Sequence, residues 1–83
     1  MVVRITFDPD KRERTLEVRG LDFKSAALVF GQAHLTFSDS RYDYGEPRFI
    51  SVGRLNGRMV IIVWTPREDA RHVISMRKAN DRE

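Results

Sequence analysis

Residues 46–79 read EPRFISVGRLNGRMVIIVWTPREDARHVISMRKA, and this stretch decides the fold. We expect it to form three consecutive antiparallel strands, over residues 48–55, 58–65 and 71–77. The first two strands flank Asn56-Gly57, the commonest two-residue hairpin signal, because both residue types tolerate positive φ. Residues 66–70 then turn the chain into the third strand.

The apolar patterns of these strands predict which of their faces are covered. Residues 59–64, MVIIVW, form a continuous apolar run, as expected of a central strand that is covered on both faces. The third strand alternates instead, so its side chains should divide into two sets. One set comprises His72, Ile74 and Met76, and the other comprises Arg71, Val73, Ser75 and Arg77.

Signals for two helices precede this stretch. Asp8 and Pro9 predict the start of a helix over residues 9–19, because Asp caps free N–H groups and Pro suits the first helical position; Gly20 predicts its end. Asp22 caps a second predicted helix over residues 23–30. Its expected apolar stripe comprises Phe23, Ala26, Ala27 and Phe30.

The remaining segments complete the expected fold. The β-rich residues 2–7 should add an edge strand and residues 34–37 a short strand, followed by a polar loop over residues 38–45. Residues 80–83 resemble the start of a further helix. The predicted fold class is α+β: one small domain spanning residues 1–83, with a mostly antiparallel sheet and two N-terminal helices packed on one face.

Composition excludes several classes of protein. The 83 residues are 41% hydrophobic and include no cysteine, which indicates a globular domain without disulfides or thiolate metal sites. Two histidines without cysteine argue against a zinc site. The longest apolar run is too short to span a bilayer, and residues 1–8 lack the apolar region of a signal peptide, so we expect a cytoplasmic protein.

Positive charge is concentrated in the second half of the chain. The formal net charge is +3, and from residue 41 onward eight of nine basic residues are arginine. They are Arg41, Arg48, Arg54, Arg58, Arg67, Arg71, Arg77, Lys78 and Arg82. An arginine-rich sheet suggests a polyanion or an acidic protein as partner, because guanidinium groups bind phosphate bidentately. The alternative is an ordinary solvated surface.

Few residues suggest catalysis on their own. The chain has no P-loop, GxGxxG or HExxH motif. Cleavage of RNA through its own 2′-hydroxyl needs no metal or cofactor; it needs a base, cations around the phosphate and an acid. Ser75 and Arg77 share a strand face that the core does not claim, and Arg67 in the preceding turn is expected to reach the same area.

Other candidates have structural alternatives. Glu46 and Arg48 lie two residues apart at the start of the first long strand and would add one carboxylate to a phosphate-binding surface. His72 is interpreted as a packed or rim histidine rather than a catalytic one. We expect Trp64 and Phe49 to belong to the core rather than to stack on bases. Asp39 and Asp43 are interpreted as solvated loop carboxylates rather than metal ligands.

Several motifs together resemble the BrnT family of ribonuclease toxins from type II toxin–antitoxin pairs. They are Asp8-Pro9-Asp10-Lys11, Gly20, Phe23 with Ala26 and Val29-Phe30, Gly45-Glu46-Pro47-Arg48-Phe49-Ile50 with Gly53, Trp64-Thr65-Pro66-Arg67, and Arg71-His72-Val73-Ile74-Ser75-Met76-Arg77-Lys78-Ala79. The resemblance implies a RelE-like fold, RNA cleavage that inhibits translation, and neutralisation by a BrnA-type antitoxin. Operator DNA would be bound only through that antitoxin.

The resemblance also implies a site without cofactor or metal. The catalytic candidates are Glu46, Arg48, Arg67, Ser75 and Arg77, and the substrate-binding candidates are Lys11, Arg19, Thr65 and Lys78. Arg67 and Arg77 would hold the phosphate, with further positive charge from Arg48 and Lys11. Glu46 would transfer protons, and Ser75 would orient a neighbour or contact the phosphate.

One departure from the family pattern leaves two functions open. Family members commonly have Lys-His-Gly where this chain has Val18-Arg19-Gly20, and Asn where Thr15 stands. Arginine is a poor general base because it stays protonated, although it can stabilise a phosphorane. Either Arg19 serves as a cation in an active nuclease, or the chain is a catalytically weak binding module that acts as antitoxin partner and co-repressor. A DNA-binding role of its own lacks a helix-turn-helix pattern.

Overall fold

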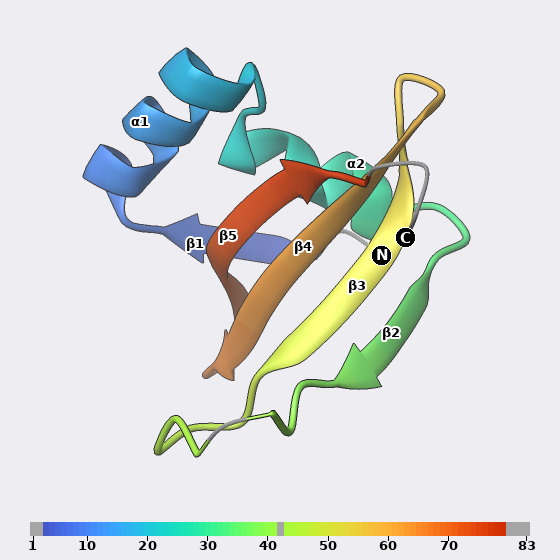
Figure 1. Cartoon of the computed structure of the whole chain (residues 1–83). Helices are drawn as coiled ribbons and strands as arrows, with labels where there is room; N and C mark the ends of the chain where they lie inside the picture. Colours follow the sequence, from blue (N-terminus) through green and yellow to red (C-terminus); the bar gives the residue numbers. More distant parts are fainter. Residues whose placement is uncertain (1–2, 42, 80–83) are drawn as a thin grey trace.

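The fold is a five-stranded sheet with a helical layer on one face. The structure, a computed structural model, describes residues 3–41 and 43–79 (Figure 1). Its elements are β1 (Arg4–Phe7), α1 (Pro9–Arg19), the 3₁₀ turn η1 (Phe23–Ser25), α2 (Ala26–Phe30), β2 (Leu35–Ser38), β3 (Phe49–Leu55), β4 (Arg58–Arg67) and β5 (Ala70–Lys78). The strand order is β1-β5-β4-β3-β2. The predictions for residues 2 and 80–83 lie outside the described residues.

The pairing of the strands agrees with the predicted hairpins and adds one parallel pair. β2, β3, β4 and β5 pair antiparallel in sequence, whereas β1 runs parallel to the first half of β5. The sheet is therefore mixed rather than purely antiparallel. Asn56 and Gly57 join β3 to β4 with φ of 52° and 78°, as the hairpin signal predicted.

The predicted helix boundaries are confirmed by their caps. Asp8 accepts a hydrogen bond from the Asp10 backbone N–H at the start of α1, and Gly20 ends the helix in the left-handed conformation with φ 69°. Asp22 caps the next segment by accepting from the Lys24 N–H. This segment begins as η1 and continues as α2, so it is not the single helix that was predicted.

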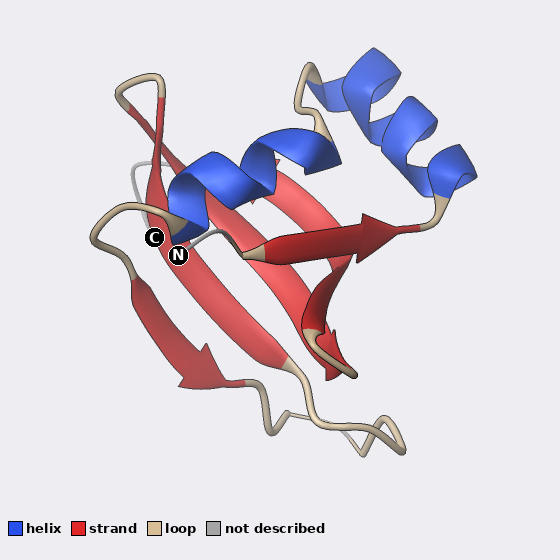
Figure 2. Cartoon of the chain, turned by 180° about the vertical axis from the view of Figure 1, so that it is seen from behind, coloured by secondary structure: helices blue, strands red, loops and turns tan. Residues whose placement is uncertain are grey.

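The helical layer η1–α2 covers the rear face of the sheet (Figure 2). Its buried side chains are Phe23, Ala26, Val29 and Phe30, and they pack on Val60, Ile62, Trp64, Val73 and Met76 of the sheet. Val29 therefore takes the place predicted for Ala27, because the initial 3₁₀ turn shifts the apolar stripe. The two layers approach so closely at Gly53 that an added Cβ would lie 2.6 Å from Val29 Cγ1.

The position of α1 differs from the prediction. None of its residues is buried, and it packs beside the edge of the sheet rather than over a face (Figure 1 and Figure 2). β1 pairs with β5 only as far as Val73, which leaves the end of β5 open for α1. Arg19 Nη1 donates to the Met76 carbonyl oxygen at 3.0 Å, so the helix satisfies a backbone group on that edge.

The front face of the sheet is open, which corrects the prediction for the central strand. Ile61 and Val63 of β4 are only half-buried, and with Ile50 and Val52 of β3 they form an apolar floor. This floor lies in a hollow of about 800 Å³ that no described element covers. The apolar run of β4 therefore reflects one buried face and one exposed apolar face.

A bulge in β5 also corrects the predicted alternation of that strand. Val63 pairs with Ser75 and Trp64 pairs with Val73, so Ile74 is an extra residue in the ladder. The extra residue places Val73 and Met76 together in the core, although simple alternation assigned them to opposite faces. Ser75 and Arg77 share the open face, as predicted, and Arg71 instead packs over Phe30 and Trp64 on the covered side.

Candidate functional site

A row of polar side chains runs along β4 and β5 beside the apolar floor. Alternation along the strands places Thr65, Arg67, His72, Ser75 and Arg77 on the open side of the sheet. Arg67 and His72 lie at the end near the β4–β5 turn, and Ser75 and Arg77 lie further along β5. The prediction that Arg67 would reach the area of Ser75 and Arg77 is wrong, because Arg67 pairs with Ala70 at the far end of the strand.

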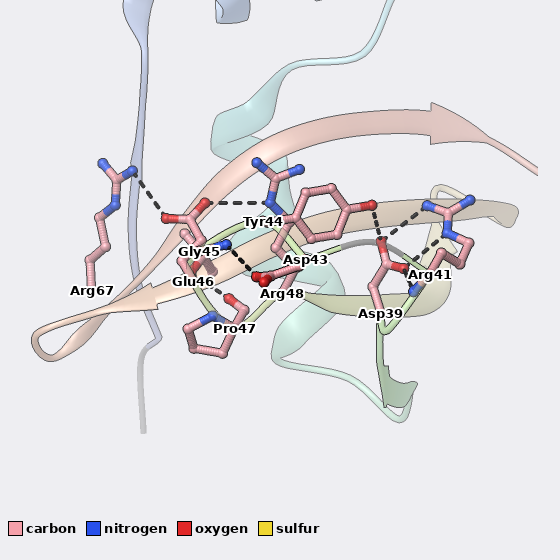
Figure 3. Close-up of polar contacts among 10 residues, drawn as sticks. Asp39, Arg41, Asp43, Tyr44, Gly45, Glu46, Pro47, Arg48 and Arg67 are labelled. Atoms are coloured by element: carbon pink, nitrogen blue, oxygen red, sulfur yellow. Dashed lines mark hydrogen bonds and ion pairs between the residues drawn. The ribbon is translucent and has the colours of Figure 1, made fainter.

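Glu46 lies between two arginines at the end of this row that contains Arg67 (Figure 3). Arg48 Nε donates to Glu46 Oε2 at 3.4 Å, and Arg67 Nη2 lies 3.8 Å from Glu46 Oε1. The structure thus brings together three of the residues that the sequence selected, from the loop before β3 and from the end of β4. Because its carboxylate is engaged by two cations, Glu46 is arranged to position guanidinium groups.

The loop before β3 is braced by a second carboxylate. Asp39 accepts hydrogen bonds from Arg41 Nε and Nη2 at 2.9 and 3.0 Å and from the Tyr44 hydroxyl at 3.3 Å (Figure 3). Arg48 stacks on the other side of this network, 3.8 Å from the centre of the Tyr44 ring. These hydrogen bonds, led by that from Arg41, lower the pKa of Asp39 to about 2. Asp39 is buried, so its interpretation as a solvated carboxylate is wrong.

Thr65 has a structural task rather than the predicted contact with substrate. Its side chain is 1% exposed, and its hydroxyl donates to the Pro47 carbonyl oxygen at 2.6 Å. This hydrogen bond fixes the loop of Glu46 and Arg48 to β4. Thr65 therefore acts on the site by positioning that loop.

α1 contributes cations at the open edge of β5. Lys11 and Arg19 line a hollow of about 270 Å³ together with Ser75. Ser75 also borders the larger hollow, which Arg77 lines with Arg58 and Arg41. Ser75 thus lies between the hollow lined by Lys11 and the hollow lined by Arg77.

Lys78 does not join the polar row. It pairs with Val60, whose side chain belongs to the covered face, so alternation directs Lys78 away from Ser75 and Arg77. Arg19 is anchored to the Met76 carbonyl, as described above, which ties α1 to β5. Of the predicted substrate-binding residues, Lys11 has the position that best suits contact with an anion.

His72 belongs to the row and is half-buried, which agrees with its interpretation as a packed or rim histidine. Its Nδ1 lies 2.9 Å from Thr6 Oγ1, and the two residues are opposite each other in the parallel β1–β5 pair. Burial lowers the pKa of His72, with a further lowering by Arg67 and Lys11 and an opposing effect of Glu46 and Asp8. The position of His72 beside Thr6 could not be predicted from the sequence, because the parallel pairing joins residues 66 positions apart.

Within residues 3–41 and 43–79, the structure holds no group of three or more His, Asp or Glu side chains placed to bind a metal ion. No helix in the same part of the chain has the length and apolar character needed to cross a membrane.

These features define a small α+β protein that presents cations and an apolar floor on an open sheet face. Residues 7–83 match the family described as the ribonuclease toxin BrnT of the type II toxin–antitoxin system. The chain belongs to this BrnT family of ribonuclease toxins.

A solved structure supports the assignment. The chain is similar to the crystal structure of the Brucella abortus ribonuclease toxin BrnT, with 28% sequence identity and a TM-score of 0.76. The match covers 95% of this chain and 99% of the Brucella chain. No curated protein matches the sequence.

Proposed function

We propose that the chain is a cytoplasmic endoribonuclease toxin that cleaves RNA through the substrate's own 2′-hydroxyl, without a metal ion, and so inhibits translation. The observation that carries the proposal is the row of Arg67, His72, Ser75 and Arg77 on the open face, flanked by Lys11. Such a row can bind the phosphates of a single strand while the open face admits the ribose. The family description supports RNA as the target.

The spacing of the row favours separate phosphate contacts. From Arg67, which pairs with Ala70, to Arg77 the strand extends about 20 Å at a rise of about 3.3 Å per residue. We therefore assign Arg67 and Arg77 to different phosphates rather than to one. Ser75 and Lys11 lie between them, where a hydroxyl and an ammonium group can contact the intervening backbone.

The polar support around Glu46 completes the first phosphate site. Glu46 contacts both Arg67 and Arg48, and Thr65 fixes the loop that carries Glu46 and Arg48. We propose that Glu46 acts by orienting these cations; a role in proton transfer would require it to leave two ion pairs. Arg48, which stacks on Tyr44, adds positive charge to the same end of the row.

The proposed partner is a BrnA-type antitoxin, through which the toxin would reach operator DNA indirectly. The large hollow supports an interaction of this kind: its floor is apolar, three of its lining residues are arginine, and none is acidic. An amphipathic antitoxin segment with apolar side chains and carboxylates fits this chemistry. Such a segment would cover Ser75 and Arg77 and exclude RNA.

Expression of the chain alone in bacteria tests the toxin function. We expect growth arrest with RNA breakdown, and loss of both in Arg67→Ala and Arg77→Ala, because each variant lacks one phosphate contact. Lys24→Ala is the matched control, since Lys24 is an exposed cation on the helical layer behind the sheet. Full toxicity of either folded arginine variant would refute the site. Normal growth with folded wild-type protein would favour the binding module and co-repressor instead.

A further inference from the structure

We propose that His72 is the general base that accepts the proton of the RNA 2′-hydroxyl. The inference rests on the proposed ribonuclease function and assigns a residue to its proton-transfer step. It arises from the position of the imidazole in the polar row, between Arg67 and Arg77, which would hold different phosphates. It replaces Glu46 in the role that the sequence had suggested.

A hydrogen bond at one ring nitrogen orients the imidazole, and the other ring nitrogen can accept a proton. His72 is half-buried on β5, between β4 and β1, and Thr6 Oγ1 contacts its Nδ1 at 2.9 Å. Among the described residues, Nε2 has no hydrogen-bond partner. A ring whose Nδ1 is fixed by a hydroxyl and whose Nε2 is free has the arrangement that a general base requires.

A hollow beside His72 offers space for the reacting ribose and phosphate. It measures about 310 Å³, and its lining residues are Arg4, Thr6, Arg67, Glu68, Asp69, Ala70 and His72. Arg4 is paired with Asp69 at 2.7 Å, whereas Arg67 lies at the longer distance of 3.8 Å from its ion-pair partner Glu46. Arg67 is therefore the cation in this hollow that can turn most readily to a phosphate next to the imidazole.

Burial and nearby cations lower the pKa of His72 and so favour the neutral ring at pH 7. Burial is the largest influence and lowers its pKa, and the cations Arg67 and Lys11 lower it further; the carboxylates Glu46 and Asp8 oppose them. Neutral imidazole can accept a proton, whereas the arginine and lysine side chains of the row are donors only. His72 is thus the member of the row best suited to act as a base at pH 7.

The step balances without an external reagent. His72 Nε2 takes the proton from the 2′-hydroxyl, O2′ forms a bond to the adjacent phosphorus, and the P–O5′ bond breaks. The 5′-oxygen leaves with a proton from water, and His72 returns its proton to the hydroxide that remains. The products are a 2′,3′-cyclic phosphate and a 5′-hydroxyl. Arg67 would stabilise the charge that develops on the phosphoryl oxygens.

The assignment also accounts for the arginine at position 19. If His72 on β5 is the base, no histidine is needed on α1. His72 and Lys11 of α1 are close enough to interact electrostatically, so β5 and α1 contribute to the same site. Arg19 is then free to tie α1 to the Met76 carbonyl. An active nuclease and Arg19 are therefore compatible.

The experiment compares His72→Gln with His34→Gln, using the purified full chain and a short RNA oligonucleotide. Gln keeps a polar group that can contact Thr6 but cannot act as a base. We expect cleavage to fall about 100-fold or more in His72→Gln, the usual contribution of general base catalysis. His34→Gln should cleave at the wild-type rate, because His34 precedes β2 and its Nδ1 contacts the Gln32 carbonyl.

The pH profile and a titration give readouts that loss of fold would not imitate. Wild-type cleavage should fall only at a pH below the ordinary histidine pKa of 6.5, because a base with a lowered pKa stays neutral down to that lower pKa and is protonated below it. The residual activity of His72→Gln should lack this limb. NMR titration of the two imidazoles should give His72 a lower pKa than an ordinary histidine.

The outcomes separate the inference from the proposed function. Cleavage by wild type with an unchanged rate and pH profile in folded His72→Gln would overturn the inference alone. A wild-type chain that cleaves no RNA would overturn the proposed function and the inference together.

Thr6→Ser and Thr6→Val test whether Thr6 positions the imidazole. The Ser variant should retain most activity and the Val variant should lose part of it, and equal activity in both would contradict the role of Thr6.

Discussion

Asp22 shows how one carboxylate positions the cationic helix beside the sheet. It accepts from the Lys24 backbone N–H at 2.9 Å, and Arg12 Nε and Nη2 donate to its two oxygens at 2.8 and 2.9 Å. The same group therefore caps η1 and joins it to α1. The hydrogen bond from Arg12 is the main reason that the pKa of Asp22 is lowered to about 2.

We predict that Asp22→Ala lowers the free energy of unfolding by about 2 kcal/mol, because it removes both a cap and a bidentate ion pair. The contribution should be fully present above the ordinary carboxyl pKa of 3.8 and should disappear as the pH falls towards 2. Urea unfolding at pH 7 and pH 2.5 measures both effects.

Asp10→Ala is the control, since Asp10 is an exposed carboxylate in the first turn of α1. A loss in Asp22→Ala equal to that of Asp10→Ala would contradict the structural role of the Arg12–Asp22 pair. A loss that stays constant down to pH 2.5 would contradict the ionic part of the argument.

At the scale of elements, features set by contacts within a few residues could be predicted from the sequence, and features set by tertiary contacts could not. The turn at Asn56-Gly57, the cap at Asp8 and the stop at Gly20 depend on contacts within a few residues, so the residue types alone predict them. The bulge at Ile74 and the parallel pairing of β1 depend on strands that meet only in the folded chain. The misassigned face of Val73 follows from that bulge.

The contacts of the candidate site also divide into local ones, which could be predicted, and tertiary ones, which could not. Ser75 with Arg77, and Glu46 with Arg48, are two residues apart, so alternation along a strand or a short loop brings each pair together. The contact of Arg67 with Glu46 and the position of His72 beside Thr6 arise from the sheet order. The burial of Thr65 likewise depends on the loop before β3, whose Pro47 carbonyl accepts its hydrogen bond, and no sequence pattern indicated this contact.

The open sheet face carries the prediction for the antitoxin. Ile61→Asp places a carboxylate in the apolar floor, so we expect it to weaken co-purification with the proposed BrnA-type antitoxin, co-expressed with the chain, by about tenfold or more, the effect of losing at least 1.4 kcal/mol of binding. The half-buried position of Ile61 on the open face should let the variant fold.

Leu28→Asp is the matched control, because Leu28 is an exposed apolar side chain, 59% exposed, on α2 behind the sheet. It should bind the antitoxin like the wild type. Equal binding by folded Ile61→Asp and wild type would show that the antitoxin docks elsewhere. Weakened binding in Leu28→Asp alone would move the interface to the helical layer.

At the scale of the whole molecule, the two faces of one sheet carry the core and the candidate site separately. The rear face holds the core under η1–α2, while the front face keeps apolar and cationic side chains available. α1 extends the front surface past the edge of β5 and adds Lys11 to it. The proposed RNA-binding row and the proposed antitoxin-binding floor would therefore lie on a single sheet.

The most direct test of the central claim is cleavage of RNA by the purified chain in EDTA, beside the same oligonucleotide with 2′-deoxyribose throughout. We predict that the RNA is cut to fragments ending in a 2′,3′-cyclic phosphate and that the deoxy strand remains intact, because the attacking group is the 2′-hydroxyl. Cleavage that stops in EDTA, or equal cleavage of the deoxy strand, would contradict the account, as would intact RNA with folded protein.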